Sequence, residues 1–316
     1  MTATLYSQPV AVVAARGPDA VDLLNRLGTQ DLRGLAAFET RFGMFVTHQG
    51  KLVANVRVLA VADELWLVTD PLQGRPLCDW LERYTVTEDA TFEVRDESWP
   101  SLRLLAADGV RPLPPAEAEA ALAPALAALT PLSPVVVACA RGWADARDLL
   151  LPPADHAAAL EALAAVGLSP GPRSAGERAR LEVGEPAVGH ELAPLSTPLE
   201  WRLGAATISW TKGCFVGQEV LGRLDNFNKV ARLSMGVRAQ ALADALETAE
   251  GRAAARVWQQ GANVGRIASV APTGGGGWLG LALVKRAAAE AGPAEVRLGD
   301  GRSLAAALEH RPFWQA

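Results

Sequence analysis

The C-terminal part of the chain, residues 232–316, is a succession of short strand patterns separated by turns. The apolar runs are brief and end at turn signals such as Gln260-Gly261 and Gly299-Asp300-Gly301. Several short strands at this spacing are typical of a small β-barrel or β-sandwich. We therefore expect residues 232–316 to form a separate domain, with strands at RLSMGVRA, RVW, NVGRIASVAP, WLGLALVKR, AEVRLG and RSLAAAL.

The preceding residues mix helix and strand patterns. Residues 42–48 and 52–62 indicate a β-hairpin with a turn at Gln49-Gly50, and LWLVTD continues it after Asp63-Glu64. Helices and antiparallel strands in this order favour α+β domains over a parallel doubly wound sheet. Further strands are predicted at TFEVRDE, SLRLLAA, VVVACA and DLLLP, and helices at 76–84, about 114–128, 154–166 and after Pro18, with Val21, Leu24 and Leu27 on one face.

Composition bounds the class of protein. A length of 316 residues predicts two or three domains, and a hydrophobic content of 50% excludes a disordered chain. The net charge of −5 argues against a general nucleic-acid coat, although a local basic groove is compatible with it. We expect no direct nucleic-acid binding and no membrane association.

The three cysteines are Cys78, Cys139 and Cys214, which lie far apart and form no CxxC motif. This spacing favours reduced thiols in the cytoplasm over a disulfide framework or a metal site. The N-terminus resembles no signal peptide. The uncharged stretch 122–140 is interrupted by prolines, so a helix end, a turn and a strand fit it better than a transmembrane helix.

One familiar motif is present in form only. Gly275, Gly277 and Gly280 match GxGxxG, but a strand pattern follows them instead of a helix. A hairpin loop is the better interpretation.

The segment 177–229 is rich in Gly, Pro and charge, which is typical of functional or surface-wrapping loops. The run FVGQEVLGRL after Cys214 can form a helix, which would put this thiol at the helix N-terminus, near Lys212. Both features favour a thiolate. The alternative is a small buried residue that packs like alanine.

Glu191 lies on an irregular loop before Pro194 and Pro198. A carboxylate there can accept parallel hydrogen bonds from an amidine-like edge such as that of guanine, a pterin or an arginine. The alternatives are a solvated carboxylate or a salt bridge to Arg178 or Arg180. Upstream, Ser174 and Glu177 match a capping box that would start a helix.

Three segments resemble a known family. KGCFVGQE at 212–219 is similar to the K-G-C-x-x-G-Q-E signature of the YgfZ-type folate-binding proteins, relatives of the glycine cleavage T-protein, an aminomethyltransferase. The run from Arg178 to Leu192 and the start GPDAVDLLNRLGTQDL resemble the same superfamily. The matching features occur in order over most of the chain.

The resemblance implies an architecture. It predicts a three-domain cloverleaf ring with a central channel for folate, built from two α+β domains and a C-terminal β-barrel. The first domain would be discontinuous, comprising residues 1–50 and 130–231, and the second would comprise residues 51–129. The barrel would comprise residues 232–316.

The resemblance also implies roles for individual residues. Glu191 matches the glutamate that binds the pterin edge of tetrahydrofolate or a derivative, and Cys214 matches the signature cysteine. Arg223 could meet the carboxylates of the folate tail. The remaining signature positions are Lys212, Gly213, Gly217, Gln218 and Glu219.

One departure from the transferase pattern bears on activity. The hairpin strand GKLVANVRVL has Asn55 where the aminomethyltransferase has a catalytic Asp, and residues 51–62 contain no Asp or Glu. An amide cannot take up a proton or stabilise a cation by charge. Aminomethyl transfer should therefore be lost or very weak.

Three hypotheses follow. The first is a tetrahydrofolate-binding accessory protein that supports iron–sulfur enzyme assembly or repair, and through it tRNA modification, with iron–sulfur enzymes or assembly factors as partners. The second is a folate-dependent aminomethyltransferase or other one-carbon transferase acting on a small amine. The third is a non-catalytic scaffold with a vestigial folate channel.

Overall fold

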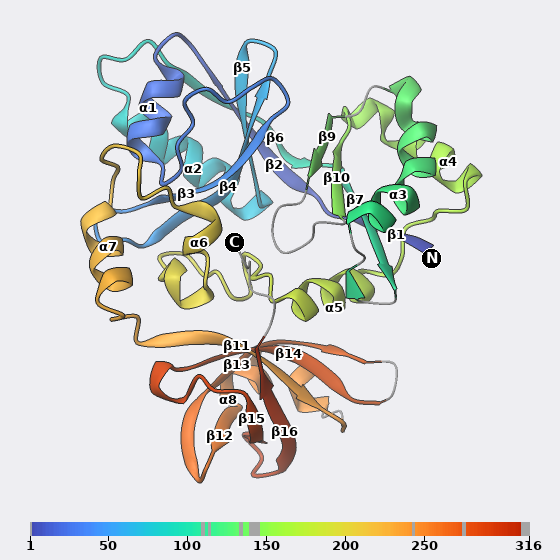
Figure 1. The fold of residues 1–316 in the computed structure, drawn as a ribbon, viewed down its shortest axis with the longest axis vertical. Coiled ribbons are helices and arrows are strands. Elements are labelled where there is room, and N and C mark those ends of the chain that lie inside the picture. The colour runs from blue at the N-terminus through green and yellow to red at the C-terminus, as the bar shows by residue number, and fades with distance from the viewer. Residues whose placement is uncertain are drawn as a thin grey trace. The chain divides into compact units, whose positions relative to one another are not determined.

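The computed structural model describes residues 2–108, 111–112, 115–132, 135–138, 146–241, 244–273 and 276–310. The chain forms two compact units (Figure 1). The first comprises Met1–Pro172 and Ala206–Val220, and the second comprises Arg173–Ala205 and Leu221–Ala316. Cys139 and Gly275 lie outside the described residues. The three-domain division remains a prediction.

The first unit contains an antiparallel sheet with strand order β3-β4-β5-β2-β6. The predicted hairpin is confirmed, because β3 (Thr40–Val46) pairs with β4 (Leu52–Val61), and β5 (Glu64–Thr69) continues it. Helix α2 (Pro71–Tyr84) packs on the sheet and begins earlier than predicted. Asp70 caps it by accepting a hydrogen bond from the Leu72 backbone N–H. The other elements of this layer are β2 (Val10–Arg16), β6 (Thr91–Trp99) and α1 (Ala20–Leu27).

Helix α1 differs from the prediction in which face it buries. Leu24 and Leu27 are buried as expected, but Val21 is 38% exposed. Leu23 takes its place in the core, because the buried stripe follows the adjacent i, i+3 and i+4 positions.

A second antiparallel sheet in the same unit has the order β1-β7-β10-β9, with the short β8 on β7. Its core is formed by leucines of the strands and the alanine-rich helices α3 and α4 (green in Figure 1). The predicted helices and strands of this region are present. Their bounds are β1 Thr2–Ser7, β7 Ser101–Asp108, β8 Arg111–Pro112, α3 Pro115–Leu129, β9 Val135–Ala138, β10 Ala146–Leu150 and α4 His156–Ala165.

A buried ion cluster joins the two sheets. Asp148 on β10 accepts hydrogen bonds from Arg103 on β7 and from Arg57 on β4. Burial alone would raise the pKa of Asp148, but the two guanidinium charges outweigh it and hold that pKa at about 2. The carboxylate is thus ionised at neutral pH, and it connects strands of both sheets.

The second unit contains a closed barrel with the order β11-β14-β13-β12-β15-β16. The predicted C-terminal β-domain is thereby confirmed, including all six strands. Alternating side chains such as Met235, Val257 and Val284 fill its interior. The strands are β11 Arg232–Ala239, β12 Arg256–Gln259, β13 Ala262–Pro272, β14 Trp278–Lys285, β15 Gly292–Arg297 and β16 Ser303–Glu309, with the short helix α8 Ala249–Ala254 beside them.

Helix α5 (Arg173–Val183) packs against β13 and β14. The predicted capping box is wrong, because Ser174 lies inside this helix and Glu177 pairs with Arg180 instead. Within the described ranges, no helix is long and apolar enough to cross a membrane.

Candidate functional site

The signature segment, residues 206–220, belongs to the first unit and is hydrogen-bonded to Thr29, just after α1. Thr29 Oγ1 donates a hydrogen bond of 2.6 Å to the Thr207 carbonyl oxygen, and the Ser209 backbone N–H donates to the Thr29 carbonyl oxygen at 3.0 Å. The segment therefore lies beside residues almost two hundred positions earlier in the chain.

Lys212 is buried and its ammonium group is fully occupied. Nζ donates hydrogen bonds to the carbonyl oxygens of Asn25, Gly28 and Gln30, the latter two at 2.8 Å. An ammonium has three donors, so none is left for a ligand. Its partners include the carbonyls that α1 leaves unpaired at its C-terminus. Burial lowers the pKa of Lys212 to about 8.

The two signature glycines have different environments. Gly217 has φ +80°, and a Cβ there would lie 2.7 Å from the Thr47 carbonyl oxygen and from Val46 Cγ2. A Cβ at Gly213 would meet nothing within 4 Å. Only Gly217 is thus required by its backbone conformation and by close approach to the end of β3.

Cys214 does not lie at a helix N-terminus. Helix α7 (Gln218–Asn226) begins four residues later, after a turn in which the Gln218 N–H donates to the Phe215 carbonyl oxygen at 3.2 Å. The argument from the helix dipole is therefore wrong, and so is the proposed help from Lys212, whose ammonium is buried under three carbonyls. The alternative of a buried packing residue is also wrong, because Cys214 is exposed.

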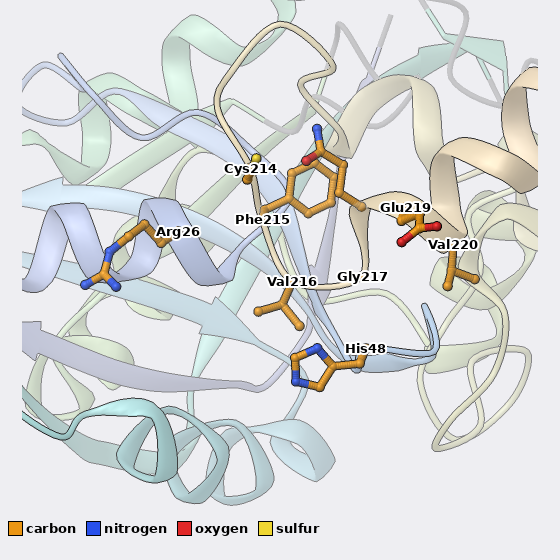
Figure 2. Close-up of a pocket in the computed structure, with 9 residues that line it drawn as sticks. Arg26, His48, Cys214, Phe215, Val216, Gly217, Glu219 and Val220 are labelled. Atoms are coloured by element: carbon orange, nitrogen blue, oxygen red, sulfur yellow. The ribbon is translucent and has the colours of Figure 1, made fainter.

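Cys214 instead lines an open pocket of about 570 Å³. Figure 2 shows the segment from Cys214 to Val220 along one side, with His48 beneath Val216 and Arg26 projecting from α1. His48 Nε2 lies 3.2 Å from the Tyr84 hydroxyl, and Arg26 is paired with Asp22 and Glu88. The pocket also includes Glu219 and Gln218 of the signature.

The second described cysteine differs from the first. Cys78 lies on the buried face of α2, in the core, and burial raises its pKa to about 11. Its thiol is therefore buried and protonated near neutral pH, whereas the thiol of Cys214 is exposed.

Glu191 belongs to the second unit, on a tight turn after α5. The backbone N–H groups of Glu191 and Leu192 both donate to the Ala187 carbonyl oxygen, at 3.1 and 3.0 Å, and Gly189 takes φ +78° within the turn. This turn points the carboxylate back into the protein, where the side chain has no solvent exposure.

The two carboxylate oxygens of Glu191 differ in their hydrogen-bond partners. Oε2 accepts hydrogen bonds from Arg180 Nη1 at 3.1 Å and from the Ala187 backbone N–H at 2.9 Å. Oε1 is buried and has no hydrogen-bond partner among the described residues. The salt bridge to Arg180 that the sequence left open is therefore present, and it leaves one oxygen unoccupied.

Arg180 was not identified as a site residue from the sequence. Besides Glu191, it donates to the Glu185 carbonyl oxygen at 2.7 Å and to both oxygens of Glu177. Burial lowers its pKa, but the surrounding carboxylates outweigh this and raise it. The sequence offered Arg180 only as one of two possible salt-bridge partners of Glu191, and the i, i+3 spacing of Glu177 and Arg180 on a helix was a further signal.

Asn55 lies on β4 in the first unit, opposite Met44 of β3. It is 8% exposed, and its backbone groups bond to Gln73 Oε1 and Thr69 Oγ1 at 3.1 and 2.8 Å. Asp63 lies in the turn that follows β4. The pairing of β3 with β4 thus puts an amide side chain, and no carboxylate, opposite Met44.

Arg223 lies in the last turn of α7 and is exposed. It belongs to the second unit, as does Glu191, whereas Asn55 and the Cys214 pocket belong to the first. The predicted residues thus form separate groups, each defined within its own unit.

The chain is similar in sequence to several proteins named aminomethyltransferase. No family model matches the chain. Proteins named aminomethyltransferase from Symbiobacterium thermophilum and Rubrobacter xylanophilus are 29% and 28% identical to it over 235 and 221 residues, or 66% and 67% of this chain. One from Thermus thermophilus is 32% identical over 178 residues, or 54% of this chain. The matches span only 60%, 58% and 44% of those relatives.

A solved structure extends the fold relation. The glycine cleavage system aminomethyltransferase T from Bartonella henselae matches with a TM-score of 0.75 at 18% identity, covering 99% of this chain and 86% of that chain. The chain therefore has the T-protein fold, and the sequence relatives support a place in that superfamily. The finer YgfZ-type assignment rests on the signature residues alone.

Proposed function

We propose that the protein binds tetrahydrofolate or a derivative, with an N–H edge of the pterin on Glu191 Oε1. The observation that carries this proposal is the unpartnered, buried Oε1 of an otherwise fully engaged carboxylate. A buried acceptor without a hydrogen bond costs about 1–3 kcal/mol, which a ligand donor would recover.

The geometry of the carboxylate restricts the ligand. Each carboxylate oxygen accepts about two hydrogen bonds, and Oε2 already accepts two. A ligand therefore has to donate to Oε1, so the edge that it presents must carry hydrogen-bond donors and no negative charge. The amino and ring N–H groups of a pterin satisfy both conditions, and the proteins of similar sequence are named for an aminomethyl transfer.

The role beyond binding is an accessory one in this proposal: support of iron–sulfur enzyme assembly or repair, and through it tRNA modification. Two features favour it over aminomethyl transfer. Asn55 cannot serve as an acid or base, and the signature thiol of Cys214 is exposed beside an open pocket. Incubation with a methylamine donor and tetrahydrofolate should accordingly give no methylenetetrahydrofolate above the uncatalysed rate.

The decisive test is calorimetric titration of tetrahydrofolate into the wild type and Glu191→Gln. In this variant the amide oxygen can keep the bonds from Arg180 and Ala187, so the NH₂ group takes the place of Oε1. The variant then presents a donor to the ligand where the wild type presents an acceptor. We expect binding to weaken by about 1–3 kcal/mol.

The matched control is Cys214→Ser, which changes one atom in the other unit and should leave folate affinity unchanged. Equal affinity of wild type and Glu191→Gln would overturn the assignment of Glu191 as the pterin anchor. No binding by the wild type would overturn the proposal as a whole and favour the scaffold hypothesis.

The thiol is tested separately with a limiting amount of an alkylating reagent and peptide mass mapping. Cys214 should be labelled much faster than Cys78, because one is exposed and the other is buried with its pKa raised to about 11. Faster labelling of Cys78 would contradict the accessibility seen in the structure. Loss of cellular function in Cys214→Ser without loss of folate binding would support a role for the thiol.

A further inference from the structure

The charge of the chain is unevenly distributed. Residues 232–316, which include the barrel, contain ten Lys and Arg against seven Asp and Glu, a net charge of +3. Residues 1–231 contain twenty against 28, a net charge of −8. A basic domain on an acidic protein marks the barrel as the part that would attract an anionic partner.

Part of this positive charge is arranged in a row. Arg256 on β12 is directly opposite Arg266 on β13 and also directly opposite Arg297 on β15. Residues directly opposite in antiparallel strands point to the same face. Their neighbours Val257 and Val296 fill the barrel interior, so the three arginines share its outer face, where all three are exposed.

The row is poorly neutralised. Arg256 donates to the carbonyl oxygens of Ala253 and Ala255, and no described carboxylate is within ion-pair distance of Arg256 or Arg266. Arg297 pairs with Glu295 at 3.1 Å and stacks over Trp258, 3.7 Å from the ring centroid. Like charges directly opposite destabilise a sheet, so the row is costly unless an anion occupies it.

Arg232 bounds the row on one side. Its charge, after burial, contributes to lowering the pKa of Arg266, which indicates that the two lie close together. Arg232 itself is held by both oxygens of Glu200, at 2.9 and 3.2 Å. The carboxylates of Glu200 and Glu191 offset part of the charge at Arg266, so Arg256 is the least compensated position of the row.

We propose that the outer-face row Arg297–Arg256–Arg266 is a docking surface for an acidic helix of a partner protein. Side chains opposite each other in a sheet have Cβ atoms about 4.5–5.5 Å apart. Side chains three or four positions apart on a helix have Cβ atoms about 5–6 Å apart. Glutamates at i, i+4 and i+8 thus match the spacing of the three arginines, and each guanidinium fork suits a carboxylate.

A nucleic acid fits this surface less well. The −8 charge of residues 1–231 opposes a long polyanion, whereas a short acidic helix needs only the row. The ring of Trp258 beside the row has one face covered by Arg297, which leaves less of it for a base to stack on.

The test is fluorescence anisotropy with the full chain and a labelled alanine-rich helical peptide that carries glutamates at i, i+4 and i+8. A second peptide of the same composition distributes the three glutamates around the helix, and a single-stranded RNA oligonucleotide is the third probe. We expect saturable binding of the first peptide, at least tenfold weaker binding of the second, and weakening by added salt.

Arg256→Glu and Arg266→Glu should each weaken binding of the first peptide at least tenfold. Arg266→Glu keeps the test valid if Arg256→Glu unfolds, because Arg266 makes no described hydrogen bond that the substitution would remove. Arg33→Glu is the matched control, since it makes the same charge change at a residue that is 61% exposed in the first unit. Its affinity should equal that of the wild type.

Three results would overturn the proposal. Equal binding of both peptides would show that the spacing of the glutamates does not matter. Equal loss of affinity in Arg33→Glu and Arg266→Glu would show that binding responds only to the net charge of the protein. Tighter binding of the RNA than of the first peptide would show that the occupant is a nucleic acid. None of these outcomes depends on folate binding.

Discussion

Lys212 in the first unit and Glu191 in the second are both charged, buried and part of motifs that the sequence singles out, yet their surroundings differ. The ammonium of Lys212 gives all three of its hydrogens to backbone carbonyls. The carboxylate of Glu191 has one oxygen bound to Arg180 and Ala187 and the other without a partner among the described residues.

The difference separates two meanings of a motif residue. A buried group whose hydrogen-bonding capacity is used up inside the protein stabilises the fold, because nothing remains to meet a ligand. A buried group with unused capacity costs free energy in the unliganded protein, and a ligand can recover it. Lys212 therefore holds the signature segment in place, and Glu191 is the better candidate for contact with a ligand.

Lys212→Met tests most directly whether Lys212 has a structural role, and we expect from it the largest change in the free energy of unfolding. The substitution keeps the aliphatic chain but leaves three carbonyl oxygens without their donor, at a cost of about 3 kcal/mol or more in the free energy of unfolding. Urea denaturation measures it. Lys229→Met, at an exposed lysine, should change stability by less than about 0.5 kcal/mol. Near-wild-type stability of Lys212→Met would instead mean that its ammonium is available for function.

Within the signature, Gly217→Ala sharpens the comparison and should have the next largest effect. The new Cβ would clash with backbone at Thr47 in a conformation with φ +80°, which should cost about 2–3 kcal/mol, seen as a lower melting temperature. Gly213→Ala is the matched control and should melt within about 1 °C of the wild type, because its Cβ would meet open space. If both variants melt alike, the close approach of Gly217 to β3 is not a structural requirement.

The spacing of apolar residues and turn residues along the chain correctly predicted the β-hairpin and the barrel strands. The hairpin follows from two apolar runs around Gln49-Gly50, and all six barrel strands follow from short runs between turns. The start of α7 was misplaced because apolar periodicity from Phe215 onward suits a helix. The sequence does not show that Gly217 adopts a left-handed conformation to approach the Thr47 carbonyl.

The site residues depend on contacts between distant parts of the chain. Lys212 reaches carbonyls more than 180 positions earlier, and Arg57 reaches Asp148 on another sheet. No spacing rule indicates such partners. For Glu191 the sequence narrowed the partner to Arg178 or Arg180, and the structure shows that it is Arg180. The charge row on the barrel likewise needs the strand register, which sets Arg256 opposite two other arginines.

The smallest predicted effect is a pH dependence that arises from Lys212. Burial lowers its pKa to about 8 in the folded protein, whereas an unfolded chain holds the proton until about pH 10.4. Between these values the unfolded state binds more protons than the folded state, so the free energy of unfolding must rise with pH. The gain from pH 8 to pH 9 should be less than about 1 kcal/mol, because partial solvent access weakens the effect. Urea denaturation at both pH values, with Lys212→Met as the reference that lacks the titrating group, isolates this contribution. If the free energy of unfolding rises by the same amount in the variant, the pH dependence arises from other groups. If it falls in the wild type alone, the three hydrogen bonds to carbonyls favour the charged ammonium more than burial disfavours it.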